Sequence, residues 1–382
     1  MAKRIINFGV IGCGMMGREF ASAAARWCHL LDLDFEPRIV AVSSQTEASM
    51  AWFQRNIPSV HLATTDYRQL LDDPQVEAVY CAVPHNLHAE IYIDTLEAGK
   101  HLLGEKPFGI DLEANKAILA AVEAHPDALV RCASEFPFFP GAYRIGEWAR
   151  EGRFGQIIEV EAGFWHSSDL NPQKPINWKR QVETNGAYGC MGDLGLHVVH
   201  MPFRFGWTPN SVRALLSKIV HERPSPDGDL VPCETWDNAL LACDAAIDGQ
   251  TFPMVLSTKR IAPGHGNTWF IRVFGTELSA FFATQNPKQL AYLPYAPGDV
   301  QAWRMVDMPH ESAYPTITGP IFEFGFSDAI LQMAAAFCDE LVNGPDMHQP
   351  FYCATPEETL ASHELFTAAL TSQRTGQTIP LQ

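Results

Sequence analysis

The chain has little positive charge. Its 382 residues include 27 Lys and Arg against 44 Asp and Glu, for a formal net charge of -17. A surface this acidic repels phosphate backbones, so the sequence argues against a nucleic-acid partner. Charged residues make up 19% of the chain and hydrophobic residues 47%, which is typical of a globular protein and excludes a disordered one.

The sequence also lacks the features of a secreted or membrane-spanning protein. Its nine cysteines include no C-x-x-C pair. Cys13, Cys81 and Cys243 lie in apolar stretches, where a thiol behaves as a small hydrophobic group. This usage is typical of a reducing compartment. No apolar run reaches the ~20 residues that span a bilayer, and the apolar start is broken by glycines and followed by no cleavage site. We expect a cytoplasmic protein.

Internal repeats and low-complexity tracts are absent as well. The length exceeds that of one ordinary hydrophobic core, so two domains are expected, over 1–132 and 133–382. In the first, short apolar runs alternate with helix-like segments, which predicts βαβ units and a parallel sheet. The predicted strands are 5–11, 38–42, 78–83, 101–103 and 129–133, and the predicted helices are 18–28, 47–55, 66–71, 88–98 and 112–124.

After residue 132 long strand-like runs follow one another without helices between them. This arrangement predicts an α+β domain on an open, largely antiparallel sheet, which makes the whole chain α/β in class. The proline- and glycine-rich stretch 224–232 is interpreted as a surface loop. The predicted strands are 157–164, 238–247, 253–259, 269–274 and 278–282, the last two as a hairpin, and the predicted helices are 330–342 and 357–372.

A glycine motif, Gly12-Cys13-Gly14-Met15-Met16-Gly17, follows the first predicted strand and opens the first helix. Strand before and helix after is the context that a Rossmann dinucleotide site requires. Gly12 allows the tight turn, Gly14 lets the backbone approach a pyrophosphate, and Gly17 lets the helix pack on the strand. The helix N-terminus would then face the phosphates. Glycines that serve only a turn are the alternative.

The second predicted strand ends in Val42-Ser43-Ser44-Gln45, without the acidic residue that usually binds both adenosine-ribose hydroxyls. The missing carboxylate removes a repulsion against the 2′-phosphate of NADP. No arginine stands beside this segment in the sequence, however. Both NAD and NADP therefore stay open as the cofactor.

Three further motifs follow in order: Pro84-His85-Asn86-Leu87-His88, Gly104-Glu105-Lys106-Pro107, and Asp193-x-x-x-His197 with His200 after it. With the glycine motif and Ala98-Gly99-Lys100-His101, this ordered set resembles the glucose–fructose oxidoreductase and inositol dehydrogenase family (Gfo/Idh/MocA) over most of the chain. The resemblance implies an NAD(P)-dependent oxidoreductase with an N-terminal Rossmann domain. It also implies a C-terminal domain that binds substrate and forms a dimer or tetramer through the open face of its sheet.

Residue roles come with this resemblance. Lys106 matches the lysine that reaches the reacting hydroxyl or carbonyl beside the nicotinamide, and Asp193 and His197 match an Asp and a general acid/base His. His200 stands where many relatives have a further Asp. The expected cofactor-binding residues are Gly12, Cys13, Gly14, Met15, Met16, Gly17, Ser43, Ser44, Pro84, Asn86, His88, Glu105, Lys106 and Pro107.

The chemistry of the same residues suits the oxidation of a secondary alcohol. An imidazole with an ordinary pKa of about 6.5 can accept the hydroxyl proton near neutral pH, and a lysine ammonium stabilises a developing alkoxide. Four residues apart, Asp193 and His197 share a helix face, so Asp193 either orients the imidazole or faces substrate. Lys106 as a surface lysine and His197 as a core histidine are the structural alternatives.

Aromatic and polar side chains before the Asp193 helix suggest a sugar-like substrate, because aromatic faces suit pyranose rings and polar groups bond hydroxyls or a carboxylate. Trp165 would equally suit a sheet core. The expected substrate-binding residues are Lys106, Trp165, His166, Trp178, Lys179, Arg180, Asp193, His197 and His200.

Several functions compete. The leading hypothesis is a dehydrogenase that transfers hydride between a nicotinamide and a secondary hydroxyl of a sugar, sugar derivative or cyclic polyol. The same family contains glycoside hydrolases that keep NAD bound and act by transient oxidation and elimination. A metal-dependent hydrolase is a third hypothesis, since Asp193, His197 and His200 have suitable spacing for Zn²⁺ or Fe²⁺. The fourth is a non-enzymatic dinucleotide-binding regulator.

Overall fold

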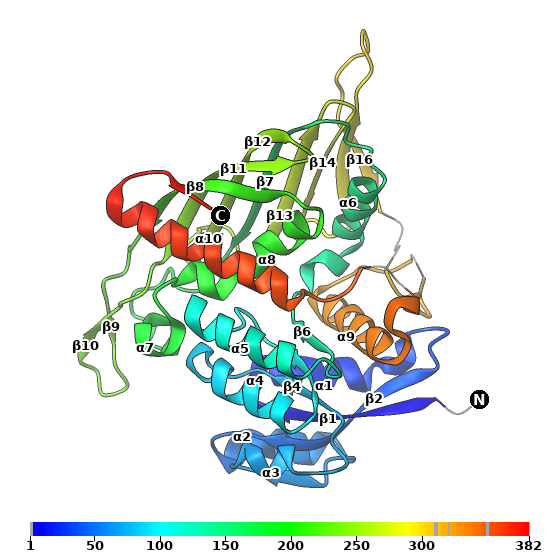
Figure 1. Ribbon diagram of the computed structural model, residues 1–382, viewed down its shortest axis with the longest axis vertical. Coiled ribbons are helices and arrows are strands. Elements are labelled where there is room, and N and C mark those ends of the chain that lie inside the picture. Colours follow the sequence, from blue (N-terminus) through cyan, green and yellow to red (C-terminus); the bar gives the residue numbers. More distant parts are fainter. Residues whose placement is uncertain (1–2, 309–311, 320, 349–350, 382) are drawn as a thin grey trace. The chain divides into compact units, whose positions relative to one another are not determined.

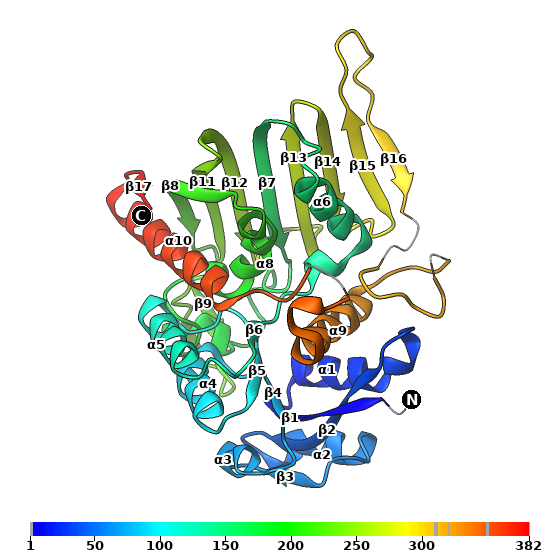
Figure 2. The same cartoon turned by 45° about the vertical axis from the view of Figure 1, so that its right-hand side comes forward.

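The computed structural model describes residues 3–308, 312–319, 321–348 and 351–381 (Figures 1 and 2). The chain divides into two compact units. The first comprises Met1–Gly109, Glu113–Phe138 and Glu311–Glu357, and the second comprises Ile110–Leu112, Phe139–His310 and Glu358–Gln382.

In the first unit six described strands form a parallel sheet in the order β3-β2-β1-β4-β5-β6. This is the strand order of a Rossmann fold, as predicted. All four residues of β4 are buried, as expected for a strand covered by helices on both faces. The strands are β1 (Arg4–Ile11), β2 (Phe35–Ser43), β3 (Leu62–Thr64), β4 (Ala78–Cys81), β5 (His101–Gly104) and β6 (Val130–Cys132).

The helices of this unit include one that the predicted domain boundary placed elsewhere. Helix α9 packs on α1 and β2, so Glu311–Glu357 belongs with the first unit and not with the rest of 133–382. Eleven successive residues of α9, Ala329–Asp339, are buried, which makes it a core helix of the first unit. The helices are α1 (Met15–Ala25), α2 (Glu47–Asn56), α3 (Tyr67–Leu71), α4 (His88–Glu97), α5 (Leu112–Ala124) and α9 (Phe326–Asn343).

In the second unit nine described strands form one sheet in the order β16-β15-β14-β13-β7-β12-β11-β8-β17 (Figure 2). Neighbouring strands are antiparallel except β7 and β12, which confirms the open, largely antiparallel sheet. The strands are β7 (Ile157–Trp165), β8 (Thr208–Ser217), β11 (Asn238–Ile247), β12 (Gln250–Lys259), β13 (Thr268–Gly275), β14 (Leu278–Ala283), β15 (Gln289–Pro294), β16 (Arg304–Asp307) and β17 (Ile379–Pro380).

Outside this sheet, the predicted loop 224–232 proves to carry a short hairpin, with β9 (Glu222–Pro224) pairing antiparallel with β10 (Leu230–Pro232). The helices of the second unit are α6 (Pro140–Arg150), α7 (Val182–Asn185), α8 (Cys190–Arg204) and α10 (Pro356–Thr375).

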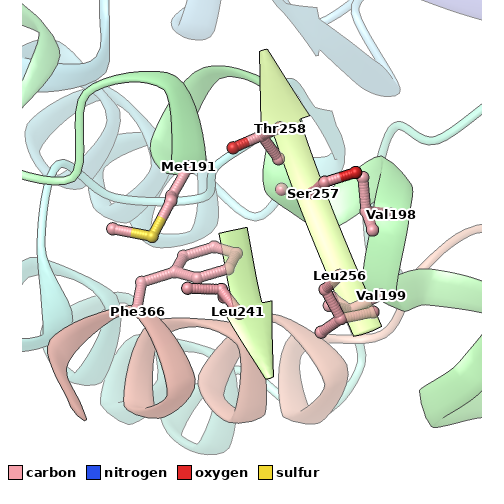
Figure 3. A pocket seen from close by; sticks show the side chains of 9 residues that line it. Met191, Val198, Val199, Leu241, Leu256, Ser257, Thr258 and Phe366 are labelled. Carbon is pink, nitrogen blue, oxygen red and sulfur yellow. The ribbon is translucent and has the colours of Figure 1, made fainter. Parts of the chain in front are cut away.

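Helix α8 carries the D-x-x-x-H motif and lies on β7, β11 and β12, with residues 190–203 all buried. Gly195 permits close packing against α10, because a Cβ there would lie 2.3 Å from Cζ of Phe366. A small apolar pocket beside this contact is lined by Met191, Val198 and Leu256 among others (Figure 3). The packing therefore holds α8 rigidly on the sheet. No helix in the described part of the chain combines the length and apolarity of a membrane span.

Candidate functional site

The glycine motif forms a turn that has room for a phosphate. Gly12 has φ +100°, and a Cβ there would lie 2.2 Å from the carbonyl oxygen of Ala82. A Cβ on Gly17 would lie 2.3 Å from the carbonyl oxygen of Gly12, whereas one on Gly14 would meet nothing within 4 Å. Met15, the first residue of α1, is 76% exposed. The turn thus leaves an open space at the start of α1, where free N–H groups and the helix dipole favour an anion.

Gly12→Ala should weaken dinucleotide binding at least about tenfold, because the added methyl group displaces the turn that approaches the pyrophosphate. Isothermal titration with NAD and NADP measures this. Gly99→Ala is the matched control, since Gly99 also has a positive φ, +67°, but has nothing within 4 Å of its Cβ position. Equal affinities in wild type and Gly12→Ala would contradict the assignment.

The residues at the ends of β2 and β4 differ in exposure. Ser43 is buried, and its carbonyl accepts a hydrogen bond from Gly12 N at 2.8 Å. His88 is fully buried, with Nε2 3.1 Å from the Val83 carbonyl and Nδ1 accepting from Gly109 N at 3.3 Å. Asn86 is exposed. We therefore reassign His88 from cofactor binding to holding the loop after β5.

Lys106 lies in the loop after β5, directly after an anchored residue, Glu105. The Tyr80 hydroxyl donates to Glu105 Oε1 at 2.6 Å, and the Tyr92 hydroxyl donates to the Glu105 carbonyl at 2.8 Å. Glu105 is buried, Lys106 is half-buried, and the Lys106–Pro107 peptide bond is cis. The backbone is thus held at Glu105, directly before Lys106, and the Lys106 side chain stays partly exposed.

A second buried carboxyl group, Glu135, lies close enough to Glu105 and Lys106 for their charges to act on it. Burial, followed by the charge of Glu105, raises its pKa to about 8, and the positive charge of Lys106 opposes the shift. Glu135 is therefore mostly protonated at neutral pH. Sequence reasoning missed it, because it stands far from Lys106 in the chain and in no motif.

Glu135→Gln should remove a loss of stability that develops as the pH rises from 4.5 to about 8. The folded-state pKa of Glu135 lies above its ordinary value of 4.5, so its contribution to stability is fully present below pH 4.5 and is lost as pH rises to about 8. Thermal melts across this range should show the variant gaining on wild type as pH rises. Glu123→Gln, an exposed site on α5, should show no such trend. Parallel curves for Glu135→Gln and wild type would disprove the shift.

In the second unit, helix α8 presents Asp193 to two cations. Lys179 Nζ donates to Asp193 Oδ1 at 2.8 Å, and Arg260 forms an ion pair with Oδ2. His197, one turn on, is 4% exposed, and its carbonyl accepts from Trp269 Nε1 at 2.7 Å. The Phe164 ring meets the imidazole edge-on at 5.6 Å. Both motif residues are therefore fixed in position, and Arg260 is a partner that sequence reasoning missed.

Asp193 belongs to a largely buried chain of ion pairs. Arg260 Nε donates to Asp169 Oδ2 at 2.7 Å, Arg180 also pairs with Asp169, and Arg180 Nη1 donates to Asp237 Oδ1 at 2.6 Å. From Lys179 to Asp237 cations and carboxylates alternate, which satisfies charges that would be costly to bury alone.

This chain of ion pairs changes the predicted role of Arg180. Its side chain is fully buried and bound to two carboxylates, so we reassign it from substrate binding to the internal ion pairs. Lys179 is half-buried, with Nζ 5.5 Å from the centre of the Trp178 ring.

His200 is also fully buried. Its Nε2 lies 3.0 Å from Arg204 Nη2 and 3.7 Å from Glu358. Burial lowers its pKa to about 3, so the imidazole is neutral at physiological pH. We reassign it from substrate binding to the support of α8. Among the described residues, no group of three or more His, Cys, Asp or Glu could hold a metal ion. Asp193 is bound by two cations and His200 lies against Arg204, so the three residues considered as metal ligands do not form a ligand set.

The aromatic candidates lie at the ends of strands. Trp165 Nε1 donates to Ser257 Oγ at 2.8 Å, and Lys259 Nζ lies 4.2 Å from the Trp165 ring. The ring of His166 has Nδ1 3.0 Å from the Gly266 carbonyl. Trp165 and His166 are both half-buried, so each keeps a surface that a ligand can touch.

Comparison with known proteins identifies relatives of both units. Residues 6–131 match the oxidoreductase family with an NAD-binding Rossmann fold (Gfo/Idh/MocA), and residues 143–280 match its C-terminal domain. Levoglucosan dehydrogenase from Pseudarthrobacter phenanthrenivorans is 29% identical over 230 residues, 58% of this chain and 57% of that enzyme. The chain thus aligns with less than two thirds of that relative. Uncharacterized oxidoreductase YrbE of Bacillus subtilis is 32% identical over 295 residues, 75% of this chain and 76% of that protein.

Solved structures agree with this fold. Levoglucosan dehydrogenase in complex with NADH superposes with a TM-score of 0.88 at 23% identity, covering 99% of this chain and 100% of that one. At this identity the likeness shows the fold.

Proposed function

Because the chain belongs to the Gfo/Idh/MocA family of oxidoreductases, we propose that it oxidises a secondary hydroxyl of a sugar or cyclic polyol and reduces a nicotinamide dinucleotide. The observation that carries the proposal is that the three motif residues Lys106, Asp193 and His197 each lie on a well-anchored segment of their own unit. Lys106 lies on an anchored loop, and Asp193 and His197 lie on a rigid buried helix.

Each residue has one task in this proposal. The bound dinucleotide supplies a hydride acceptor. His197 accepts the proton of the reacting hydroxyl, and Lys106 donates a hydrogen bond that stabilises the developing alkoxide. Asp193, already bound by Lys179 and Arg260, accepts a hydrogen bond from a substrate hydroxyl or fixes the direction from which His197 acts.

The ion pairs support a neutral substrate. Lys179 was one of the polar residues expected to bond substrate hydroxyls or a carboxylate, but its ammonium group is already 2.8 Å from Asp193. An anionic substrate would have to compete with that carboxylate. We therefore propose a neutral hydroxylated ring. Trp165 and Trp178 are half-buried aromatic surfaces that suit such a ring.

The proposal is tested by incubating the protein with NAD or NADP and a panel of neutral sugars, anhydrosugars, cyclic polyols, uronates and aryl glycosides. Stoichiometric formation of reduced cofactor with a neutral sugar or polyol supports the dehydrogenase. Release of aglycone without net reduction would instead establish the NAD-dependent glycoside hydrolase. Cofactor binding without either reaction across the panel would favour a regulator.

We also propose that the second unit associates with another copy of the chain. On the outer face of its sheet, Leu215 of β8 and Leu240 of β11 are cross-strand partners and are 60% and 40% exposed. Ile158 of β7 is 54% exposed. Exposed apolar side chains on an open sheet face are typical of an interface.

Sedimentation velocity should therefore show a dimer or tetramer, and Leu215→Glu with Leu240→Lys should shift it toward monomer. Val300→Glu, at an apolar loop site that is 90% exposed, is the control and should leave the assembly unchanged. A monomeric wild-type protein would rule out this proposal.

A further inference from the structure

The end of β2 is tied to the glycine turn. The Ser43 carbonyl accepts hydrogen bonds from Gly12 N at 2.8 Å and from the Cys13 thiol at 3.7 Å. In Rossmann domains the residues just after this strand stand beside the adenosine ribose and decide between a 2′-hydroxyl and a 2′-phosphate. Ser44, half-buried, occupies that place.

An arginine that is distant in sequence reaches the same corner. Arg18 of α1 is exposed, and its guanidinium carbon lies 5.6 Å from the centre of the Trp52 ring on α2. Cys13 gives a second indication of its position. Burial raises the pKa of the Cys13 thiol to about 12, against the opposing effects of the Arg18 charge and of a hydrogen bond with the Ser44 side chain. The Cys13 thiol thus senses the charge of Arg18 and hydrogen-bonds Ser44, and its Sγ lies 3.7 Å from the Ser43 carbonyl at the end of β2.

The start of α2 adds to the positive potential. Thr46 is its N-cap and accepts a hydrogen bond from Ser49 N at 3.3 Å, so the N-cap of α2 comes two residues after Ser44 and the helix N-terminus lies at this corner. The first acidic residue after the strand is Glu47, which is exposed and lies within α2. No carboxylate thus stands at the position where a ribose-binding acid would.

From this corner we propose that Arg18, Ser44 and the N-terminus of α2 form a subsite for the 2′-phosphate of the adenosine ribose, so that the protein binds NADP in preference to NAD. This inference rests on the proposed function, because it assumes a bound dinucleotide.

The chemistry of the three groups fits a phosphate monoester. The guanidinium donates two parallel hydrogen bonds to phosphate oxygens, and the Ser44 hydroxyl donates a third. Stacking on Trp52 limits the freedom of the Arg18 side chain before the ligand arrives, which lowers the entropy lost on binding. A 2′-hydroxyl offers this corner no charge to neutralise.

The test is isothermal titration of the full chain with NADP and with NAD. Wild type should bind NADP at least about tenfold more tightly than NAD, the scale of a charge-assisted hydrogen bond. Arg18→Gln should weaken NADP binding at least about tenfold and NAD binding less than about threefold. Ser44→Asp should reverse the preference, since a carboxylate there repels the phosphate and binds both ribose hydroxyls.

Arg55→Gln is the matched control, because Arg55 is another exposed arginine, in the last turn of α2. It should change neither affinity. Arg18 is exposed, so its loss should leave the melting temperature unchanged, and this is checked alongside. Tighter binding of NAD in wild type, or equal losses for both nucleotides in Arg18→Gln, would overturn the subsite while leaving the proposed function intact. Failure to bind either nucleotide would overturn both.

Discussion

Lys106→Ala and His197→Ala should each lower kcat at least about 100-fold while changing cofactor affinity little. That is the scale for loss of a positioned acid/base or of a charge that stabilises the transition state. Removing Lys106 takes away the donor to the developing alkoxide, and removing His197 takes away the acceptor for the hydroxyl proton. Neither residue belongs to the glycine turn that is expected to hold the dinucleotide, so titration with NAD and NADP should be nearly unchanged.

Steady-state kinetics with the substrate found in the panel measures this effect. Lys116→Ala is the control for Lys106, because Lys116 is an exposed lysine of α5 that pairs with Glu113. It should retain full turnover. For His197 the dependence on pH gives a further readout, since the acid limb of kcat/KM that follows protonation of the base should disappear in His197→Ala. Wild-type turnover in either alanine variant would show that its assigned role is wrong.

Asp169→Asn should lower the free energy of unfolding by about 3–5 kcal/mol, the usual cost of removing one partner from a buried ion pair. Asp169 is 1% exposed and pairs with both Arg180 and Arg260, which are themselves buried. The amide would leave two buried guanidinium groups without their shared counter-charge. This loss is a large fraction of the ~5–15 kcal/mol that stabilises a typical domain.

Urea unfolding followed by circular dichroism measures the loss, with Asp227→Asn at an exposed loop position as control. The pH dependence gives an independent check. Burial alone would raise the pKa of Asp169, but Arg260 and Arg180 outweigh it, and the net pKa lies below the usual 3.8. The ion pairs therefore stabilise the fold above pH 3.8, and this contribution is lost as the pH falls through the lowered pKa. A variant as stable as wild type would show that the network contributes little.

Local patterns in the sequence were enough to predict most of the fold. The helix over Leu112–Ala124 was predicted with the bounds that the structure has, and the glycine motif follows β1 and leads into α1 as expected. Among the features that the sequence did not predict, two depend on packing. Strand β3 has three half-buried residues and no alternation, and α9 joins the first unit although it follows the second unit's strands in the chain.

The candidate site was predicted less completely, because its charges are set by contacts between distant residues. The motifs pointed to Lys106, Asp193 and His197. The role of Arg260 depends on the packing of α8 against β12. The role proposed for Arg18 depends on the packing of α1 and α2 against β2. Proximity in the sequence was also a poor guide to role. Lys179 and Arg180 are adjacent and were both expected to bind substrate, yet Arg180 is fully buried.

Hydride transfer to a nicotinamide dinucleotide is the central claim, and isotope transfer tests it most directly. A substrate from the panel is deuterated at the carbon that carries the reacting hydroxyl, and the reduced cofactor is then isolated and weighed by mass spectrometry. We predict that the reduced nicotinamide gains one deuterium for each molecule of substrate oxidised. Reduced cofactor without deuterium, or product formed with no reduced cofactor at all, would contradict the account.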